Sequence, residues 1–139
     1  MLVLDANILI RAVLGTQVRG LFAQYGGQIE FLAPDVAFDE ARRWLPELIE
    51  RRKMTTGPFM AYFESLASVV GMVGPEVYAD FERVARQRLA RRDENDWPIL
   101  ATALALRCPM WTEDTDFFGC GVATWTTDRV ELLLAEVRH

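Results

Sequence analysis

The chain has 139 residues, of which 51% are hydrophobic and 25% charged, and its net charge is −5. This length and composition predict one globular domain over residues 1–139 and exclude a disordered chain. No apolar run is long enough to span a membrane, and no signal peptide is expected. The acidic balance argues against a surface that binds nucleic acid only by counterion release. It does not argue against a nuclease whose clustered carboxylates hold cations.

Cysteine and histidine content narrows the chemistry further. Cys108 and Cys120 are too few and too far apart for a disulfide scaffold, so we expect reduced, buried thiols in a cytoplasmic protein. His139 is the only histidine and the last residue. Its position argues against a Ser-His-Asp triad, a histidine general base and a His-rich zinc site.

The chain begins with a short apolar run that ends in a carboxylate. Leu2, Val3 and Leu4 are followed by Asp5, and Asn7 comes two residues later. A short continuous apolar run is typical of a strand buried on both faces in a parallel sheet. Open α/β sheets bind their ligands beyond the carboxyl ends of such strands. Asp5 is therefore the first candidate site residue.

A second candidate acid is predicted on a helix that follows the second strand. This strand is expected over residues 28–33, and Asp35 is the expected N-cap of a helix that starts at residue 36. Pro46 should kink or end this helix at about residue 45. Glu40 lies on the shoulder of the apolar stripe, about 90° from its centre, whereas Asp39 faces solvent. Glu40 can therefore reach a site at the edge of the core.

The middle of the chain is expected to contribute three more elements and two charged segments. We expect helices over residues 59–68 and 76–90 and a short strand over 69–73. The charged run over residues 47–53 is either a solvated helix end or part of a nucleic-acid surface. Five arginines form a cluster near the end of the second of these helices: Arg83, Arg86, Arg88, Arg91 and Arg92. They could contact phosphate, or they could be solvated side chains at a helix C-terminus, where the helix dipole favours cations.

Further acids open a buried helix and follow a strand. Residues 99–106 are apolar on every side, which predicts an interior helix with Asp96 as its N-cap or first residue. A plain capping role would also explain Asp96. A strand over residues 110–112 leads to Asp114 and Asp116, which a turn with local side-chain hydrogen bonds would also explain. A last strand over 122–125 precedes a final helix.

The alternation of strands and helices predicts an α/β fold with a mainly parallel sheet. Strand carboxyl ends share one edge of such a sheet, so the separated acids can converge. Crowded carboxylates repel one another, and Mg²⁺ or Mn²⁺ relieves this repulsion because both ions prefer oxygen ligands. The convergence predicts a metal site formed by Asp5, Glu40, Asp96, Asp114 and Asp116.

Four segments resemble the motifs of PIN-domain proteins, a family of small metal-dependent nucleases that includes the VapC-like toxins of toxin–antitoxin pairs. They are Leu-Val-Leu-Asp5-Ala-Asn7, the helical Glu40, Asp96-Trp-Pro-Ile-Leu-Ala and Trp111-Thr112-Glu113-Asp114-Thr115-Asp116-Phe117. The resemblance covers essentially the whole chain with motif order intact. It implies a three-layer α/β/α arrangement, single-stranded RNA as substrate, a homodimer and an antitoxin partner. Asn7 and Thr112 are supporting residues of the same motifs.

Three alternatives remain open at this stage. The first is a PIN-like module that binds nucleic acid or a partner without catalysis. The second is a phosphatase with Asp5 as nucleophile, although that chemistry wants a second acid where Asn7 stands. The third is a structural domain that binds a partner through exposed aromatic residues. Metal binding and RNA cleavage discriminate among them.

Overall fold

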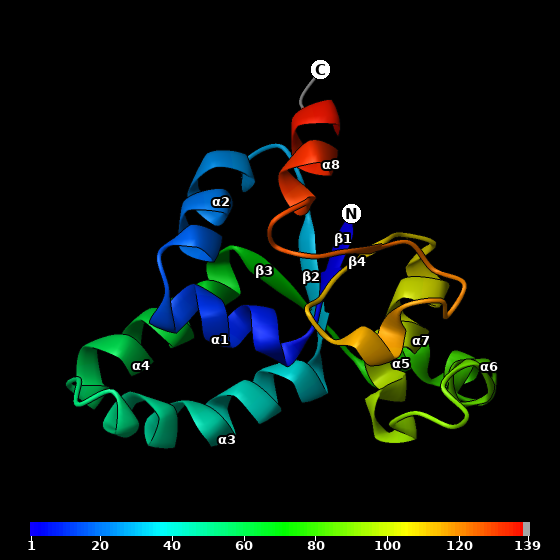
Figure 1. Ribbon diagram of the computed structural model, residues 1–139, viewed down its shortest axis with the longest axis horizontal. Coiled ribbons are helices and arrows are strands. Elements are labelled where there is room, and N and C mark those ends of the chain that lie inside the picture. Colours follow the sequence, from blue (N-terminus) through cyan, green and yellow to red (C-terminus); the bar gives the residue numbers. More distant parts are fainter. Residues whose placement is uncertain (138–139) are drawn as a thin grey trace.

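The computed structural model describes residues 1–137, and its centre is a five-stranded sheet in which every strand pairing is parallel (Figure 1). The strand order is β3-β2-β1-β4-β5. The strands are β1 (Leu2–Leu4), β2 (Phe31–Pro34), β3 (Val70–Val73), β4 (Met110–Trp111) and β5 (Thr124–Trp125). The predicted α/β fold with a parallel sheet is confirmed. His139, the histidine on which the case against histidine chemistry rests, lies outside the described residues.

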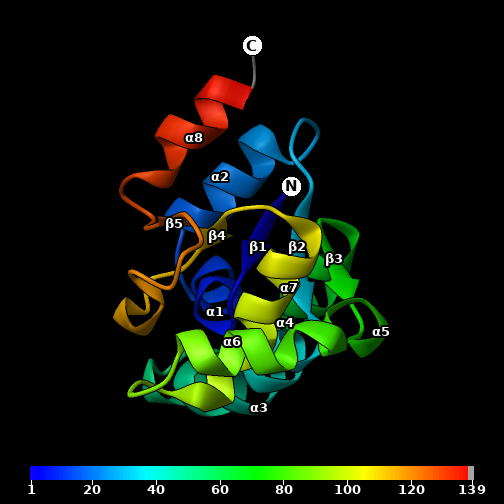
Figure 2. The ribbon, with the colours of Figure 1, turned by 90° about the vertical axis from the view of Figure 1, so that its right-hand side faces the viewer.

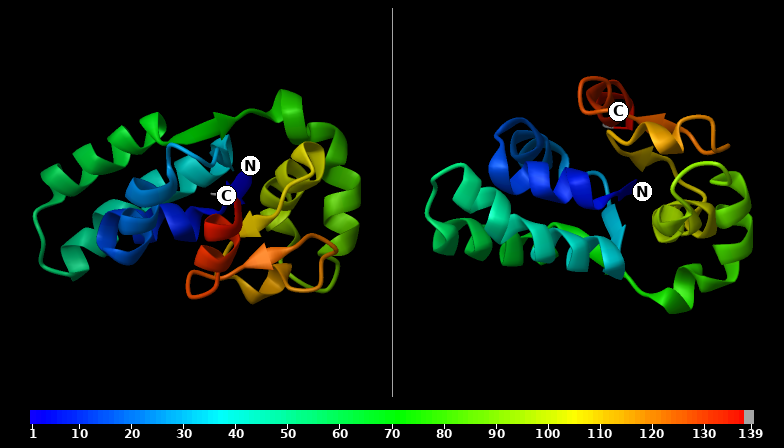
Figure 3. Two further views of the ribbon diagram at one scale, coloured as in Figure 1. Left: turned by 90° about the horizontal axis from the view of Figure 1, so that it is seen from above. Right: turned by 60° about the horizontal axis from the view of Figure 1, so that its bottom comes forward.

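Two layers of helices cover the sheet, as the views from other directions also show (Figure 3). The chain moves from β1 through β2 to β3 in one direction and then crosses back to β4. Because such crossovers are right-handed, the helices before β3 lie on one face of the sheet and the helices between β3 and β4 lie on the other. One layer holds α1 (Ala6–Leu14), α2 (Gln17–Tyr25), α3 (Asp35–Arg51) and α4 (Thr56–Ser65). The other holds α5 (Pro75–Tyr78), α6 (Glu82–Arg88) and α7 (Trp97–Leu106).

The last helix, α8 (Val130–Val137), lies beside α2 at one end of the molecule (Figures 1 and 2). The Tyr25 hydroxyl donates a hydrogen bond to Glu131 over 3.4 Å and links the two helices. Single 3₁₀ turns complete the chain: η1 (Leu66–Ser68), η2 (Ala79–Phe81), η3 (Glu94–Asp96) and η4 (Thr115–Phe117). None of the helices within residues 1–137 is both long and apolar enough to cross a membrane.

The core contains the segments that were expected to be interior. All residues of β1 and β2 are buried, as are residues 98–103 of α7. Trp111 of β4 packs against Phe22 and Phe31, with ring centroids 5.7 and 6.1 Å away. Both cysteines are buried free thiols, as expected. This close packing around the strands fixes the positions of the side chains that follow their carboxyl ends.

The structure differs from the helix predictions in three details. Of the two outcomes expected at Pro46, a kink or an end, the end does not occur: helix α3 continues to Arg51, because Leu45 and Ile49 on either side of the proline are completely buried. Their burial outweighs the one backbone hydrogen bond that proline removes. The helix expected over residues 76–90 is divided into α5 and α6 by the 3₁₀ turn η2. Asp35 is also the first helical residue rather than the N-cap, and it accepts a hydrogen bond from the Tyr78 hydroxyl over 2.6 Å.

The sheet order creates a topological switch point at its centre. The chain continues from β1 to β2 on one side, while β4 lies on the other side of β1. Ligand sites in open α/β sheets lie at the carboxyl ends of the strands beside such a point. The register pairs Leu4 with Trp111, so Asp5 and Thr112 leave the sheet side by side.

Candidate active site

Asp5 is held by hydrogen bonds to both of its carboxylate oxygens. As the N-cap of α1 it accepts from the Ile8 backbone N–H through Oδ1 over 3.1 Å. The Thr112 hydroxyl donates to its Oδ2. Asp5 is 6% exposed, so its position and rotamer are fixed by the fold. A buried carboxylate with both oxygens engaged is poorly placed to attack a phosphate, which disfavours the phosphatase alternative.

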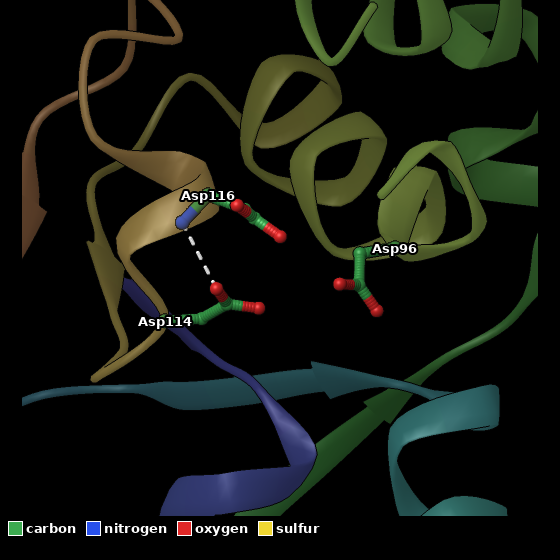
Figure 4. A group of neighbouring side chains, drawn as sticks. All are labelled: Asp96, Asp114 and Asp116. Atoms are coloured by element: carbon green, nitrogen blue, oxygen red, sulfur yellow. Dashed lines mark hydrogen bonds between the residues drawn. The ribbon is translucent and has the colours of Figure 1, made fainter. Parts of the chain in front are cut away.

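Asp96 stands at the N-cap position of α7, but its side chain makes no capping hydrogen bond. Pro98 in the first turn of α7 has no N–H to be capped, and the Asp96 carboxylate turns toward Asp114 and Asp116 (Figure 4). The plain capping role considered from the sequence is therefore not what orients this side chain. A half-buried carboxylate is left available for another ligand.

Asp114 and Asp116 lie in and beside η4, directly after β4. The Asp116 backbone N–H donates to Asp114 Oδ1 over 2.9 Å, and the Asp114 backbone N–H donates to Thr112 Oγ1 over 2.9 Å. One carboxylate oxygen from each of Asp96, Asp114 and Asp116 lies within 4.8 Å of those of the other two. Figure 4 shows these carboxylates facing a common space from two separate segments.

A hollow of about 340 Å³ collects the other candidates around the same place. Its polar lining comes from Asp5, Asn7, Glu40, Asp96 and Asp114. The structure thus brings four of the five predicted acids into one hollow, and Asp116 joins them through its proximity to Asp96 and Asp114. Thr112 is fully buried behind Asp5.

Asp39, the sequence neighbour of Glu40, does not line this hollow. It contacts Arg42 at 3.5 Å and lines an adjacent hollow instead. The choice of Glu40 over Asp39, made from the helical face alone, agrees with this placement.

Burial and crowding raise the pKa of two of these acids. Burial is the main cause for Asp5, whose pKa rises to about 6 although hydrogen bonds from Thr112 and Ile8 oppose the shift. The charges of Asp114 and Glu40 add to it. Burial is also the main cause for Asp96, whose pKa rises to about 7 with contributions from Asp93, Asp114 and Glu40. Asp5 and Asp96 therefore keep their protons to a higher pH than free carboxyl groups do, and a bound cation would displace those protons.

Arg92 supports the site in a way that the sequence did not indicate. Its guanidinium donates to the Asp116 carbonyl oxygen over 2.6 Å and to the Phe118 carbonyl oxygen, so it holds η4 from outside. Two other arginines of the same cluster also engage this chain. Arg86 pairs with Glu82 at 2.7 Å, and Arg88 donates to the Cys120 carbonyl oxygen over 3.3 Å. The Arg86 pair is a local i,i+4 contact, but no local pattern reveals the contacts of Arg88 and Arg92, because they join segments far apart in the chain.

The donor set fits a hard divalent cation. Carboxylate oxygens are the ligands that Mg²⁺ and Mn²⁺ prefer, and three of them from Asp96, Asp114 and Asp116 lie close together here. Asp5 and Glu40 stand in the adjacent wall of the hollow. A bound cation would offset the repulsion from Asp114 and Glu40, which adds to the burial that raises the pKa values of Asp5 and Asp96.

This chain belongs to the PIN-domain family, whose model, described as PIN domain, matches residues 3–135. PIN domains are generally nucleases, so the fold and the acidic cluster together indicate a hydrolase type of reaction on nucleic acid. No curated protein matches the chain.

Proposed function

We propose that this chain acts as one domain that hydrolyses phosphodiester bonds of single-stranded RNA as a divalent-metal-dependent endoribonuclease. The observation that carries the proposal is the convergence of acids from three separate segments. Asp5 follows β1, Asp96 opens α7 and Asp114 follows β4, and all three line one hollow. Carboxylates are costly to crowd in this way, so a site that keeps them together implies a cation that uses them.

The acids divide into two groups by their role. We assign Asp5, Asp96 and Asp114 as ligands of Mg²⁺ or Mn²⁺, with Asp116 as a further ligand, directly or through water. When bound, such a cation stabilises charge on the phosphodiester and lowers the pKa of a water. Glu40, which also lines the hollow, serves as a further ligand or accepts a hydrogen bond from the attacking water and orients it.

Two uncharged side chains complete the assignment. Asn7 lines the hollow two residues after Asp5 and is exposed, so its amide can hold Asp5 or a water beside the phosphate. Thr112 fixes Asp5 and the Asp114 backbone at once, and it therefore positions two of the assigned ligands. Neither residue takes part in proton transfer.

The toxin role is the finer part of this proposal. We propose that the protein works in the cytoplasm as a homodimer and that a small antitoxin protein blocks the acidic hollow. A short reading frame immediately upstream of the gene would support the pairing. Light scattering of the purified protein measures the oligomeric state, and a monomer would remove the dimer from the proposal without affecting the chemistry.

Cleavage of an unstructured oligoribonucleotide with Mn²⁺ or Mg²⁺ tests the function. Wild-type protein should cleave it, EDTA should stop the reaction, and Asp96→Asn should lower the rate by at least about 100-fold because a ligand charge is lost. Asp80→Asn, on an exposed turn away from the hollow, is the matched control and should retain full activity. Equal activity of Asp96→Asn and wild type would reveal a contaminating nuclease.

The same preparation separates the alternatives. A silent binding module would show a thermal shift with Mn²⁺ and no cleavage by the wild type. A structural partner-binding domain would show neither.

A further inference from the structure

The acidic hollow lies between two larger hollows, and helix α3 lines all three. The acidic hollow shares the lining residues Asn7, Ile10 and Leu48 with a hollow of about 480 Å³ on one side. It shares Glu40, Asp96 and Ile99 with a hollow of about 670 Å³ on the other. Because neighbouring hollows share lining residues, we infer that the three form one continuous depression with the carboxylates in its middle. A chain-like ligand can therefore cross the site from one side to the other.

The hollow on the Asn7 side is basic. Arg11 and Arg52 line it, and no acid does. Within residues 1–137 neither guanidinium has an acid at ion-pair distance, unlike Arg42, Arg51 and Arg86. Arg11 stands one turn, about 6 Å, beyond Asn7 on α1. Arg52, at the end of α3, is about 18 Å along the helix from Glu40. Two unpaired cations beside an acidic site are placed for anions that approach it.

The hollow on the other side has the opposite character. Asp39, Glu40, Asp93 and Asp96 line it against one cation, Arg43, so this hollow suits an uncharged base better than a phosphate. It also contains the indole of Trp44, which is 44% exposed in spite of its size. The Arg43 guanidinium lies 5.5 Å from the centre of that ring. An exposed indole beside a guanidinium offers a stacking surface to a flat ring.

We propose that a single strand of RNA crosses this depression with its phosphates on Arg11 and Arg52 and a base stacked on Trp44. This path rests on the proposed function, since it places the scissile phosphate over the carboxylates. Single-stranded nucleic acid is bound by a basic track together with aromatic stacking surfaces, and the two are found here on opposite sides of the site. The path assigns binding roles to three residues outside the acidic cluster.

The arginine cluster around α6 is the rival surface. Three of its members are already engaged within the chain: Arg86 with Glu82, Arg88 with Cys120 and Arg92 with Asp116. Arg83 and Arg91 remain exposed, and neither lines any of the three hollows. They provide a matched control with the same loss of two charges.

The test compares a long with a minimal substrate. The ratio of kcat/KM for a 12-residue oligouridylate to that for bis(p-nitrophenyl) phosphate should fall at least about 10-fold in Arg11→Gln/Arg52→Gln. The log–log salt dependence of 12-mer binding should flatten by about 1.4, that is, about 0.7 for each lost phosphate contact. Arg83→Gln/Arg91→Gln should change neither quantity. Trp44→Ala should raise KM for the 12-mer, and Trp44→Tyr should restore it.

Two results would overturn the path. One is that Arg11→Gln/Arg52→Gln keeps the wild-type ratio of kcat/KM values and the wild-type salt dependence of 12-mer binding. The other is that these two quantities fall only in Arg83→Gln/Arg91→Gln. Fluorescence anisotropy of the labelled 12-mer keeps this test separate from that of catalysis. A wild type that binds the 12-mer through Arg11 and Arg52 but cleaves nothing would refute the nuclease and leave the path standing. The Mn²⁺-induced thermal shift of each variant checks that the carboxylates are undisturbed.

Discussion

Thr112 donates its hydroxyl hydrogen to the carboxylate of Asp5, although 107 residues separate the two in the chain. The contact exists because β1 and β4 are neighbours and their register places Leu4 opposite Trp111. The same hydroxyl oxygen accepts a hydrogen bond from the Asp114 backbone N–H. One buried side chain thus connects the acids that follow two different strands.

Thr112→Val should disturb the site more than its small change in shape suggests. It removes a donor to Asp5 and an acceptor for the Asp114 N–H, which should cost about 1–3 kcal/mol of the free energy of unfolding. The hydrogen bond from Thr112 lowers the pKa of Asp5, so its loss should raise that pKa further and shift Mn²⁺ binding to higher pH.

Calorimetric titration of Mn²⁺ at several pH values measures this shift, and Thr112→Ser should restore wild-type behaviour. Thr102→Val is the matched control, because the Thr102 hydroxyl is equally buried but bonds only to the Pro98 carbonyl of its own helix. An equal pH shift in both variants would mean that Thr112 has only a packing role.

Asp5→Asn should abolish metal-dependent cleavage while it stabilises the metal-free protein at neutral pH. The pKa of Asp5 is raised to about 6, so its ionised form destabilises the fold above that pH. Asparagine removes the buried charge and can keep an acceptor for the Ile8 N–H. Thermal unfolding at pH 7.5 with EDTA should give a Tm several degrees above that of the wild type. A lower Tm would mean that the lost hydrogen bonding outweighs the charge.

The stability of the metal-free protein should fall as pH rises from about 4 to 7. Asp5 and Asp96 have pKa values of about 6 and 7 in the folded chain, against 3.8 when free, so the folded state binds more protons across this window. The free energy of unfolding then decreases with pH. Metal binding must displace the same protons, so Mn²⁺ affinity should increase over that range. The Tm difference with and without Mn²⁺ should be larger at pH 7.5 than at 5.5; a constant difference would contradict the assigned ligands.

Glu40→Gln and Asp39→Asn form a matched pair on one helix. Glu40 lines the acidic hollow, whereas Asp39 does not and contacts Arg42. Glu40→Gln should lower kcat for RNA cleavage by about 100-fold, as expected for loss of a group that binds the metal or orients the attacking water. Asp39→Asn should change it less than twofold. Steady-state kinetics with saturating Mn²⁺ distinguish them, and the reverse order would assign the role to Asp39.

Arg92→Gln should weaken metal binding without removing a ligand. Its guanidinium holds the carbonyl oxygens of Asp116 and Phe118, so the shorter side chain releases η4. Loss of a residue that positions a ligand typically weakens metal affinity by about 10- to 100-fold. Arg91→Gln removes the neighbouring charge without that contact and is the control. An equal loss of Mn²⁺ affinity in the two variants would show that Arg92 acts only through its charge.

Local chemistry was sufficient to predict that the strands and the interior helix exist, although the strand expected over residues 28–33 is Phe31–Pro34 in the structure. The run Leu2–Leu4 is apolar at every position, as a strand buried on both faces must be, and residues 99–106 are apolar on every side of a helix. The same local reasoning allowed α3 to end at Pro46, which the structure contradicts, because burial of Leu45 and Ile49 against distant segments decides where α3 ends. Helix-breaking residues act on local backbone, but long-range packing can outweigh them.

The sequence by itself determined which acids stand at the ends of elements, since a carboxylate after an apolar run needs no distant partner to be recognised. Only the tertiary structure decided which of them meet. Strand order is a long-range property, so it was the placement of β4 beside β1 that brought Thr112 to Asp5. The same folding brought Asp96 within 4.8 Å of Asp114 and Asp116 and placed Arg92 behind them. Their spacing depends on how α7 and η4 are placed relative to each other in the fold, which no local pattern contains.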